Sequence, residues 1–582
     1  MHIPTQSPRQ SLYFDYQVYP YYHSQQDTQS DEQTVTLVGG GLIGMTTAIM
    51  LAKYGVKVIL ITDEQQLAEG SRALVYTKRS LEILNAAGVA DTVMQKALPW
   101  THGKSIYKGK TVFRMAHTVD ENDQFPPLSN LQQDYLESYL LEQIEQHDDI
   151  EVRWGNKVVD LDDHKDHVTL SIQTPEGEYQ HTSNWVVAAD GGRSFIRSHL
   201  NLKMEGDSYE GRFVIADIRI KLDHPTERLA FFSPDWNPNN TRLMHREPDD
   251  IWRFDYQLDP TVTPEEALKP ENLKKAVADQ LKMIGKDHLE WQLDWSTVYS
   301  ARALTLPGFV HDRIIFVGDA AHLLPIFGVR GANTGFQDAF DLSWKLAAVI
   351  NGWGNQDLLQ SYSTDRVQAA KEICAEAGKS TRFMSPPSHG YQVLRDAVLS
   401  LSLEHDFVRP LYHWRTSRPH AYHSSPLNSQ NDDNASMNTI TANGELFPNL
   451  KTSNGTYLYD ELNGGFSVLV FTNDAISCDL QQEVKALTDQ NIPIKVIALS
   501  TTECSIQDAD VTYQVDKQVR AERYFTQEGS VYFVRPDHHI AGRWLNYDDH
   551  VARAAHAITK TLAPFLQRQQ TVKANKQGNQ CE

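Results

Sequence analysis

The sequence predicts an α/β protein of several domains, with a Rossmann-like nucleotide-binding unit, an antiparallel sheet and a separate α/β domain near the C-terminus. Two glycine-rich turns, at 39–44 and 318–335, each follow a β-branched strand and open a helix, as nucleotide-binding turns do. The length of 582 residues exceeds what one hydrophobic core normally serves. We therefore expect the chain to divide into domains around these two turns.

The composition narrows the class of partner. The chain has 54 basic and 75 acidic residues, a net charge of −21. Because phosphate contacts need clustered Lys and Arg, nucleic acid is not expected as a partner. No long apolar run predicts a membrane span, and no secretory leader is visible. Four cysteines (Cys374, Cys478, Cys504 and Cys581) have neither paired nor metal-ligating spacing, which favours a cytoplasmic protein without a metal site.

The first glycine turn lies in the order strand, loop, helix, strand: TVTLVGG, then GLIGMTTAIMLAKYG, then VKVILIT. In Gly39-x-Gly41-x-x-Gly44, the first glycine permits the tight turn, the second lets a pyrophosphate approach the backbone, and the third lets the helix pack on the strand. The helix N-terminus then holds the phosphates. An acid that binds the ribose is expected at the end of the second strand, where Thr62 stands. Asp63 is therefore the candidate, and the alternative is that no acid touches the ribose.

The succession of strands, helices and polar stretches predicts the domain order. We expect an extended arm at 1–33, a nucleotide-binding domain at 34–200 and 300–385, a strand-rich substrate domain at 201–299, a helical connection at 386–423, a linker at 424–442, an α/β domain at 443–566 and a disordered tail at 567–582.

Three motifs in a fixed order carry a family resemblance: GGGLIG in the first turn, ADGGRSFIR at 189–197, and GDAAH with a following Pro and GANTG at 318–335. GSRA at 70–73 and RSLE at 79–82 fit the same pattern. Over residues 34–385 the chain resembles the group A flavoprotein aromatic hydroxylases, the family of p-hydroxybenzoate hydroxylase and phenol hydroxylase. The resemblance implies a split FAD-binding domain of the GR2 type and an antiparallel-sheet substrate domain. The C-terminal domain resembles the thioredoxin-like tail of phenol hydroxylases, without a Cys-x-x-Cys pair.

The resemblance also implies where FAD binds. Asp319 would accept hydrogen bonds from the ribityl chain, and the helix N-terminus at 331–335 would face the flavin pyrimidine edge. Asp190 and Arg193 would form an ion pair that maintains the fold and contacts the cofactor or NADPH. The candidate cofactor-binding residues are Gly39, Gly41, Gly44, Asp63, Arg72, Gln133, Asp190, Arg193, Gly318, Asp319, Gly331, Ala332 and Asn333.

The activity implied is a monooxygenase that uses NADPH or NADH as a transient co-substrate, and O₂, to hydroxylate a small phenolic compound. In this family the reduced flavin forms a C4a-hydroperoxide that the substrate ring attacks, so the protein mainly orients groups and helps to deprotonate the substrate. Pro325 would lie over the reacting edge of the flavin. On the sheet wall the catalytic candidates are His245, Arg253 and Tyr256, each with the alternative of a packed strand residue.

One departure from the family is Gly328-Val329-Arg330-Gly331, where many relatives carry Gly-Gly-Gln-Gly. Arg330 has two possible roles. Its cation favours an anionic substrate or the reduced flavin, or else the side chain points to solvent and has no such role. Two other functions are alternatives. A flavin-dependent halogenase typically carries Trp-x-Trp-x-Ile-Pro, which 291–295 does not match. A non-catalytic flavoprotein would use its C-terminal domain to bind a partner. Because this domain has no Cys-x-x-Cys pair for a redox role, we expect it to form a homodimer contact or to pack on the FAD domain.

Overall fold

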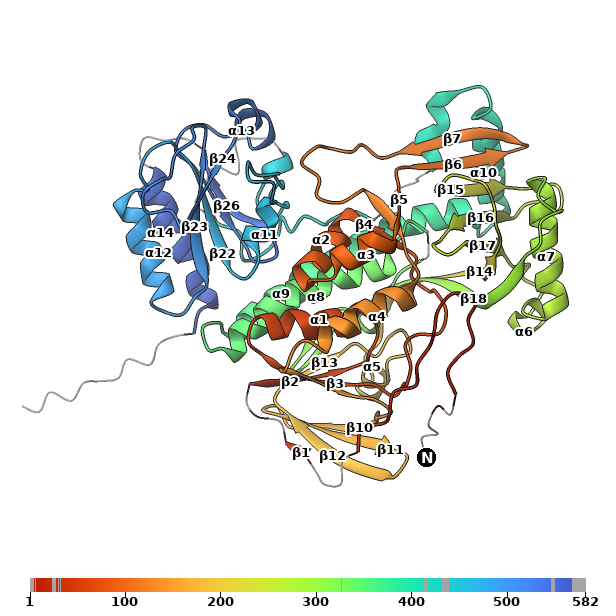
Figure 1. Cartoon of the computed structure of the whole chain (residues 1–582), viewed down its shortest axis with the longest axis horizontal. Coiled ribbons are helices and arrows are strands. Elements are labelled where there is room, and N and C mark those ends of the chain that lie inside the picture. The colour runs from red at the N-terminus through yellow and green to blue at the C-terminus, as the bar shows by residue number, and fades with distance from the viewer. Residues whose placement is uncertain are drawn as a thin grey trace, which may run out of the picture.

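The computed structural model describes residues 5, 7–23, 28–29, 31, 33–325, 327–412, 417–430, 439–545 and 550–567. Most of the predicted tail at 567–582, and part of the predicted linker and arm, lie outside these residues. Figure 1 shows a nucleotide-binding region in the centre, a large antiparallel sheet on one side and the C-terminal domain on the other. No helix in the described part of the chain has the length and apolarity needed to cross a membrane.

The centre of the nucleotide-binding region is a six-stranded sheet in the order β19-β20-β13-β2-β3-β9. Its strands are β2 (Thr34–Val38), β3 (Lys57–Ile61), β9 (Ile150–Arg153), β13 (Val186–Ala188), β19 (Val310–His311) and β20 (Ile314–Phe316). All pair in parallel except β19 with β20. Strands from both halves of the predicted domain, 34–200 and 300–385, therefore lie in one sheet, and the carboxyl ends of β2 and β20 lead into the two glycine turns.

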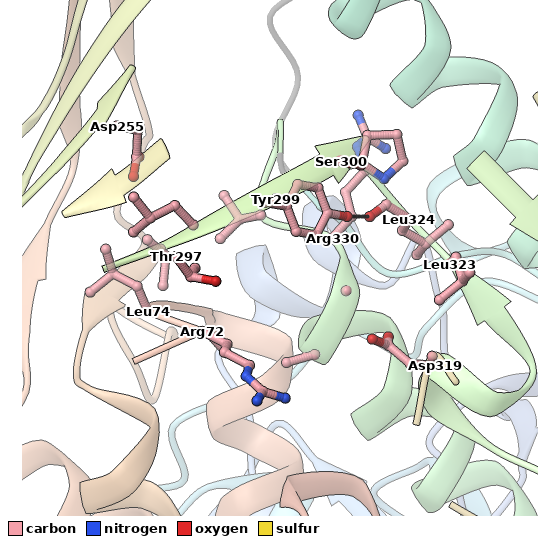
Figure 2. Close-up of a pocket in the computed structure, with 18 of the residues that line it drawn as sticks. Arg72, Leu74, Asp255, Thr297, Tyr299, Ser300, Asp319, Leu323, Leu324 and Arg330 are labelled. Carbon is pink, nitrogen blue, oxygen red and sulfur yellow. Dashed lines mark hydrogen bonds between the residues drawn. The ribbon is translucent and has the colours of Figure 1, made fainter. Parts of the chain in front are cut away.

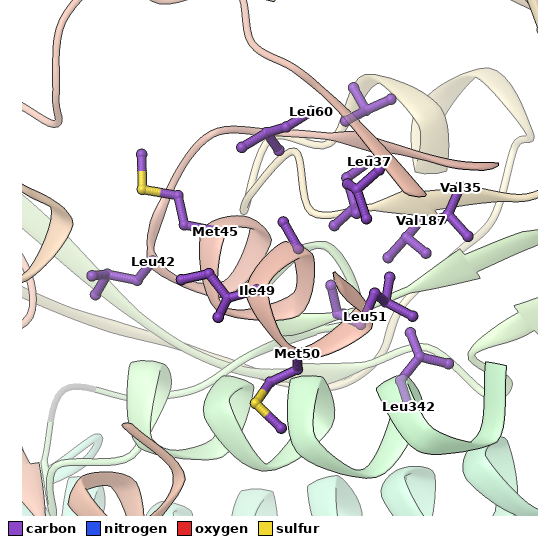
Figure 3. Packing of buried hydrophobic residues seen from close by; sticks show 14 of the residues in the cluster. Val35, Leu37, Leu42, Met45, Ile49, Met50, Leu51, Leu60, Val187 and Leu342 are labelled. Carbon is purple, nitrogen blue, oxygen red and sulfur yellow. The ribbon is translucent and has the colours of Figure 1, made fainter. Parts of the chain in front are cut away.

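Helix α1 (Leu42–Lys53) lies between this sheet and helix α8 (Gly331–Ile350), as Figure 3 shows. Because α1 is covered on both sides, its residues 44–52 are all buried. The close approach of α1 and α8 depends on Gly335, since a Cβ there would lie 2.7 Å from the side chain of Ile43. The two glycine turns are thus held side by side by the packing of the helices that follow them.

The large antiparallel sheet has eight strands in the order β21-β18-β14-β17-β16-β15-β6-β7. Their bounds are β6 (His102–Tyr107), β7 (Lys110–Ala116), β14 (Glu205–Arg219), β15 (Arg228–Phe232), β16 (Thr241–Arg246), β17 (Ile251–Gln257), β18 (Gln292–Thr305) and β21 (His322–Leu323). The β6–β7 hairpin comes from the segment predicted as nucleotide-binding domain, but pairs with β15. Helices α6 (Pro264–Ala267) and α7 (Pro270–Met283) lie beside the sheet, and Val277 and Leu281 of α7 pack in one cluster with Trp252.

The C-terminal domain has a five-stranded sheet in the order β24-β23-β22-β25-β26. Its elements are α11 (Leu458–Leu462), β22 (Phe466–Phe471), α12 (Cys478–Thr488), β23 (Ile494–Ser500), β24 (Val511–Gln514), α13 (Lys517–Arg523), β25 (Ser530–Val534), β26 (Ile540–Trp544), α14 (His550–Leu562) and η5 (Ala563–Phe565). Cys478 and Cys504 are exposed free thiols. A thioredoxin-like assignment for this domain stays a prediction.

Buried charges join the C-terminal domain to the nucleotide-binding region. Arg535 pairs with Asp341 at 2.8 Å and with Asp365 at 3.1 Å, and Lys345 pairs with Asp341 at 2.9 Å. All four side chains are at most 1% exposed, so removing one partner would leave an unpaired charge in a dry environment. The domain therefore packs on α8 and α9 (Gln356–Met384) through these ion pairs.

The stretch predicted as an exposed linker at 424–442 is largely buried in its described N-terminal part. Ser425, Leu427 and Asn428 are all buried, and Ser425 donates a hydrogen bond to Asp365. This part of the segment is therefore integrated into the contact between the two regions, because its polar side chains are used as hydrogen-bond partners there.

Residues 7–23 of the predicted arm contain no helix or strand and lie against the rest of the molecule. Arg9, Ser11 and the backbone of Leu12 all bind the buried carboxylate of Asp294 on β18. The Tyr16 hydroxyl, like that of Tyr13, donates to Asp134. The arm thus links the antiparallel sheet to the helix α4 (Gln133–Ile144) and packs against both.

The remaining elements connect these regions. They are β1 (Thr28–Gln29), β4 (Val75–Thr77), α2 (Lys78–Ala87), α3 (Ala90–Lys96), β5 (Leu98–Trp100), β8 (Leu128–Asn130), α4 (Gln133–Ile144), β10 (Lys157–Asp163), β11 (Val168–Thr174), β12 (Gly177–Ser183), α5 (Phe195–His199), η1 (Gly318–Ala320), α10 (His389–Leu401), η2 (Asp406–Tyr412) and η4 (Thr439–Thr441).

Candidate active site

A cavity of about 820 Å³ lies where the nucleotide-binding region meets the antiparallel sheet. One end is lined by residues of the predicted nucleotide motifs and the other by side chains of β15, β16 and β17. Figure 2 shows Asp319 and Asp255 at opposite ends, with Thr297 and Tyr299 of β18 between them. The cavity thus brings together sequence segments that lie more than 200 residues apart.

The first glycine turn has the geometry that the sequence predicts. Gly39 has φ +118, and Gly44 packs so closely that a Cβ would overlap the Gly39 carbonyl oxygen. At Gly41 a Cβ would meet only one atom, Glu137 Oε1 at 3.9 Å, so space remains beside the backbone. No side chain caps the N-terminus of α1. Its backbone N–H groups are therefore available to an anion such as a pyrophosphate.

At the second turn, Gly318 has φ +58 and Asp319 is exposed to the cavity. Arg197 fixes this turn against the 189–197 motif, because its guanidinium donates to the carbonyls of Ala320 at 3.0 Å and Gly192 at 2.7 Å.

The predicted pairing of Asp190 with Arg193 is wrong. Asp190 instead accepts a hydrogen bond from the backbone of Ile196 in the first turn of α5, whose N-cap is Ser194, and Arg193 is exposed at the edge of the cavity. Arg197, one helical turn further on, performs the fold-maintaining role that the sequence assigned to Arg193.

Asp338 is a buried anchor that sequence reasoning missed. Its carboxylate accepts from the Gly318 backbone at 3.0 Å, from His322 at 2.7 Å and from Arg366 at 2.6 Å. Although burial opposes the charge, Arg366 and His322 hold the pKa of Asp338 below its usual value. The carboxylate therefore locks the second turn to α8 and α9. The signal was available in the sequence, since an Asp and an Arg inside apolar helices have to find buried partners.

At the start of α8, Gly331, Ala332 and Asn333 line the cavity, and no side chain caps the helix. The Asn333 amide is taken up by the protein itself: it accepts from the backbone of Thr77 and from Ser80, and donates to the carbonyls of Val75 and Val329. Its side chain thus joins α8 to the β4–α2 segment, which leaves the backbone N–H groups for a ligand.

Val329 and Arg330 precede this helix. Val329 has φ +60, a conformation that is strained for a β-branched residue. Arg330 is 6% exposed, lines the cavity and donates to the Phe327 carbonyl. The alternative that Arg330 points to solvent is therefore wrong: the side chain is buried just before α8, and its charge also reaches Cys374 on α9.

Arg72 is exposed to the cavity, as predicted for a cofactor contact. Gln133 lies beside it but is engaged with the protein, accepting from the Ala73 backbone and donating to Glu137. Burial raises the pKa of Glu137 to about 7. Asp63 is exposed just beyond the end of β3 and does not line the cavity. Its contact with a ribose stays a prediction.

Three of the four predicted catalytic residues line the cavity, and Tyr256 lies on the opposite face of the antiparallel sheet. His245 and Arg253 line the cavity, as does Pro325, and Tyr299 donates to the neighbouring Leu324 carbonyl at 2.7 Å (Figure 2). Tyr256 does not line the cavity: Arg242 stacks over its ring at 4.3 Å, among side chains of the opposite sheet face. Its assignment to the site is wrong, because alternate residues of a strand point to opposite faces.

Arg253 lines the cavity with its hydrogen-bonding capacity largely used. It pairs with Asp217 through two contacts of 2.8 and 2.9 Å and donates to the backbone carbonyls of Ser71 and Arg72. Glu247 lies 3.5 Å away. Arg253 therefore ties the antiparallel sheet to the loop that carries Arg72, which is a positioning role.

Two further charged residues of the wall were missed: Arg228 on β15 and Asp255 on β17. Both are buried, with Arg228 5% and Asp255 6% exposed. Burial lowers the pKa of Arg228 to about 10, so it remains a cation at neutral pH, and burial raises the pKa of Asp255 to about 7. The cavity therefore combines the uncapped N-terminus of α8 at one end with a buried acid, base and cation at the other.

A glycine turn with an uncapped helix N-terminus, and a cavity that a second domain walls, define the class as a nucleotide-binding protein. Residues 32–377 match the family described as FAD binding domain, and the chain belongs to it. The predicted cofactor, FAD, is thereby confirmed for the domain, and the free backbone at Gly41 and α8 together with Asp319 fit its phosphates, flavin edge and ribityl chain. Among the described residues no cluster of His, Cys, Asp and Glu could hold a metal ion.

Known proteins similar to this chain include the 3-(3-hydroxy-phenyl)propionate/3-hydroxycinnamic acid hydroxylase of Escherichia coli K12, 27% identical over 366 residues. That match covers 62% of this chain and 64% of the relative, so less than two thirds of the relative's length is matched. Among solved structures, the flavin-dependent monooxygenase PieE, in complex with FAD and substrate, has a TM-score of 0.77 at 20% identity and covers 92% of this chain and 100% of its own. Aklavinone-11 hydroxylase, with FAD and aklavinone, has a TM-score of 0.72 at 22% identity, covering 91% and 99%. These two share the fold.

Proposed function

We propose that the protein is an FAD-dependent monooxygenase that uses NAD(P)H and O₂ to hydroxylate a phenolic compound. The overall change would be a phenol, O₂, NAD(P)H and a proton giving a dihydroxybenzene, NAD(P)⁺ and water. The similarity to the hydroxylase of Escherichia coli supports this activity, and so does a cavity that is continuous between the nucleotide motifs and the sheet wall.

The observation that carries the proposal is that one cavity has residues of the nucleotide motifs at one end and an apolar and charged sheet surface at the other. Bound FAD would supply the two-electron chemistry that activates O₂. The chain supplies the start of α8, where backbone N–H groups and Arg330 stabilise negative charge on the reduced ring. Leu243 and Ile215 offer an apolar surface to an aromatic ring, and Arg228 lies among them. We therefore expect an aromatic substrate that carries, or develops, a negative charge.

The proposal is tested with purified protein and a panel of phenols and phenolic acids that includes 3-(3-hydroxyphenyl)propionate. We expect a yellow protein that releases FAD on denaturation, oxidises NADPH or NADH faster when a substrate is added, and forms a product heavier by one oxygen. A colourless protein, or NAD(P)H oxidation that no phenol stimulates, would refute it. The cytoplasmic location and the homodimer belong to the same proposal, and cell fractionation and sedimentation test them.

A further inference from the structure

His245 and Asp255 form an acid–base pair on the wall of the cavity. His245 lies on β16 and Asp255 on β17, and His245 Nε2 is 3.9 Å from Asp255 Oδ2. Both side chains line the cavity, and Figure 2 shows Asp255 at the end away from Asp319. The two side chains share this face because His245 pairs with Arg253 in the strand register, and Asp255 lies two residues further along β17.

Each member of the pair has an unused polar atom. In the described part of the chain, His245 Nδ1 and Asp255 Oδ1 are buried and have no hydrogen-bond partner. Buried polar atoms are nearly always satisfied, because leaving one without a partner costs about 1–3 kcal/mol. A ligand hydroxyl in the cavity would supply the missing partner to Asp255 Oδ1.

The surrounding charges suit a proton acceptor. Burial has the largest effect on the pKa of Asp255 and opposes the ionised form, as does Asp217 on β14, whereas Arg253 on the same strand and Arg228 on β15 favour it. The resulting pKa is about 7, so the carboxylate can either hold or release a proton at neutral pH. Burial, Arg228 and Arg253 lower the pKa of His245, which keeps the imidazole neutral.

We propose that Asp255 is the base that takes the hydroxyl proton of the phenolic substrate. The substrate O–H bond breaks, an O–H bond forms on Asp255, and the electron pair stays on the substrate oxygen as phenolate. No electrons are exchanged in this step, and the nearby guanidinium of Arg228 stabilises the phenolate. The inference rests on the proposed function and names the catalytic residue of the same site.

The test compares wild type with Asp255→Asn on two substrates: 3-(3-hydroxyphenyl)propionate, or the screened phenol with the highest kcat/KM, and its analogue with fluorine beside the hydroxyl. Fluorine makes the phenol more acidic, so deprotonation of the fluorinated substrate depends less on a base. We expect Asp255→Asn to lower kcat about 100-fold on the parent phenol and less than tenfold on the fluorinated one. In wild type, kcat should rise with pH through an apparent pKa near 7, because the base acts when unprotonated, and Asp255→Asn should lack this rise.

Two further variants separate chemistry from structure. Asp255→Glu keeps a carboxylate and should recover the pH dependence and part of the rate, whereas Asp235→Asn, an exposed carboxylate in the loop before β16, should behave like wild type. Flavin content should be unchanged in all variants. An equal loss of kcat on both phenols, or an unchanged pH profile in Asp255→Asn, would overturn the inference about Asp255 and leave the proposed function intact. If wild type hydroxylates no phenol, the proposed function fails and the inference fails with it.

Discussion

The two ends of the cavity are built from different materials. The nucleotide end is made of glycines, free backbone N–H groups and side chains that remain accessible, such as Arg72 and Asp319. The substrate end is made of buried charged side chains that hold one another in place, such as Arg253 with Asp217. The nucleotide end depends on the absence of side chains, whereas the substrate end depends on buried ion pairs. We therefore expect added side chains to damage the nucleotide end, and lost charges to damage the substrate end.

The largest effect is expected from Gly44→Ala at the nucleotide end. The new Cβ would overlap the Gly39 carbonyl oxygen, so α1 would have to move away from β2 and the phosphate site would be lost. We expect protein without bound flavin, measured by absorbance after gel filtration. Gly390→Ala, where the nearest atom is 3.9 Å from the new Cβ, should keep its flavin. Full flavin content in Gly44→Ala would show that this turn tolerates a side chain.

At the substrate end, Arg253→Met should lower the free energy of unfolding by about 3–5 kcal/mol, because it leaves Asp217 and Glu247 buried beside each other without their cation. Chemical denaturation measures the change. The matched control is Arg212→Met on β14, whose side chain is exposed and donates to the Pro260 carbonyl, and it should cost less than about 1 kcal/mol. A similar loss in both variants would contradict the distinction between the two arginines.

The substrate end should also make stability depend on pH. Folding raises the pKa of Asp255 from 3.8 to about 7, so the folded protein binds more protons than the unfolded chain between these values, and stability falls as pH rises across them. Asp255→Asn removes this contribution, which is at most about 1.4 kcal/mol per pH unit. Thermal unfolding of both proteins from pH 4 to 8 should show the variant gaining relative to wild type. A constant difference would contradict the raised pKa.

Removing a charge at the start of α8 should change the reduction potential of bound FAD. In Arg330→Gln the buried cation beside the helix N-terminus is lost, so the anionic reduced flavin is less stabilised. We expect the reduction potential of bound FAD to fall by about 30 mV, equivalent to about 1.4 kcal/mol for two electrons. Arg313→Gln, a surface arginine that donates to the Lys165 carbonyl, should leave the potential unchanged. An unchanged potential in Arg330→Gln would indicate that the guanidinium does not act on the flavin.

The smallest effect concerns backbone strain. Val329→Gly should raise the free energy of unfolding by about 0.5–1 kcal/mol, since the left-handed conformation costs an L-residue about 1–2 kcal/mol and glycine returns part of that as chain entropy. Val310→Gly in the regular strand β19 should be destabilising instead. If Val329→Gly is also destabilising, the packing of the Val329 side chain outweighs its strain.

The sequence predicted the nucleotide end well, because its chemistry is local. Gly39, Gly44 and Gly318 each act through their own backbone and immediate neighbours, so a motif a few residues long contains the whole argument. The parallel sheet, α1 and α8 followed from the same motifs. Arg197 and Asp338 were missed because their partners come from other motifs.

The substrate end was harder to predict because its residues meet across strands. The alternation in β17 did contain the answer: Trp252, Phe254 and Tyr256 point to one face, so Arg253 and Asp255 share the other. Reading that period would have excluded Tyr256 and suggested Asp255. The position of Arg228, and the pairing of the β6–β7 hairpin with β15, depend on long-range strand order that no local pattern contains.

The arm at residues 7–23 has a consequence for how the chain folds during synthesis. Ser11 binds Asp294, 283 residues further along the chain, so this early segment cannot complete its contacts until about half of the protein has been translated. Contacts of such sequence separation form slowly, because a long loop must close first. The end of the arm that carries Ser11 therefore completes its contacts only after β18 has been made, whereas Tyr19 and Tyr22 bond to the earlier residues Gln65 and Trp154.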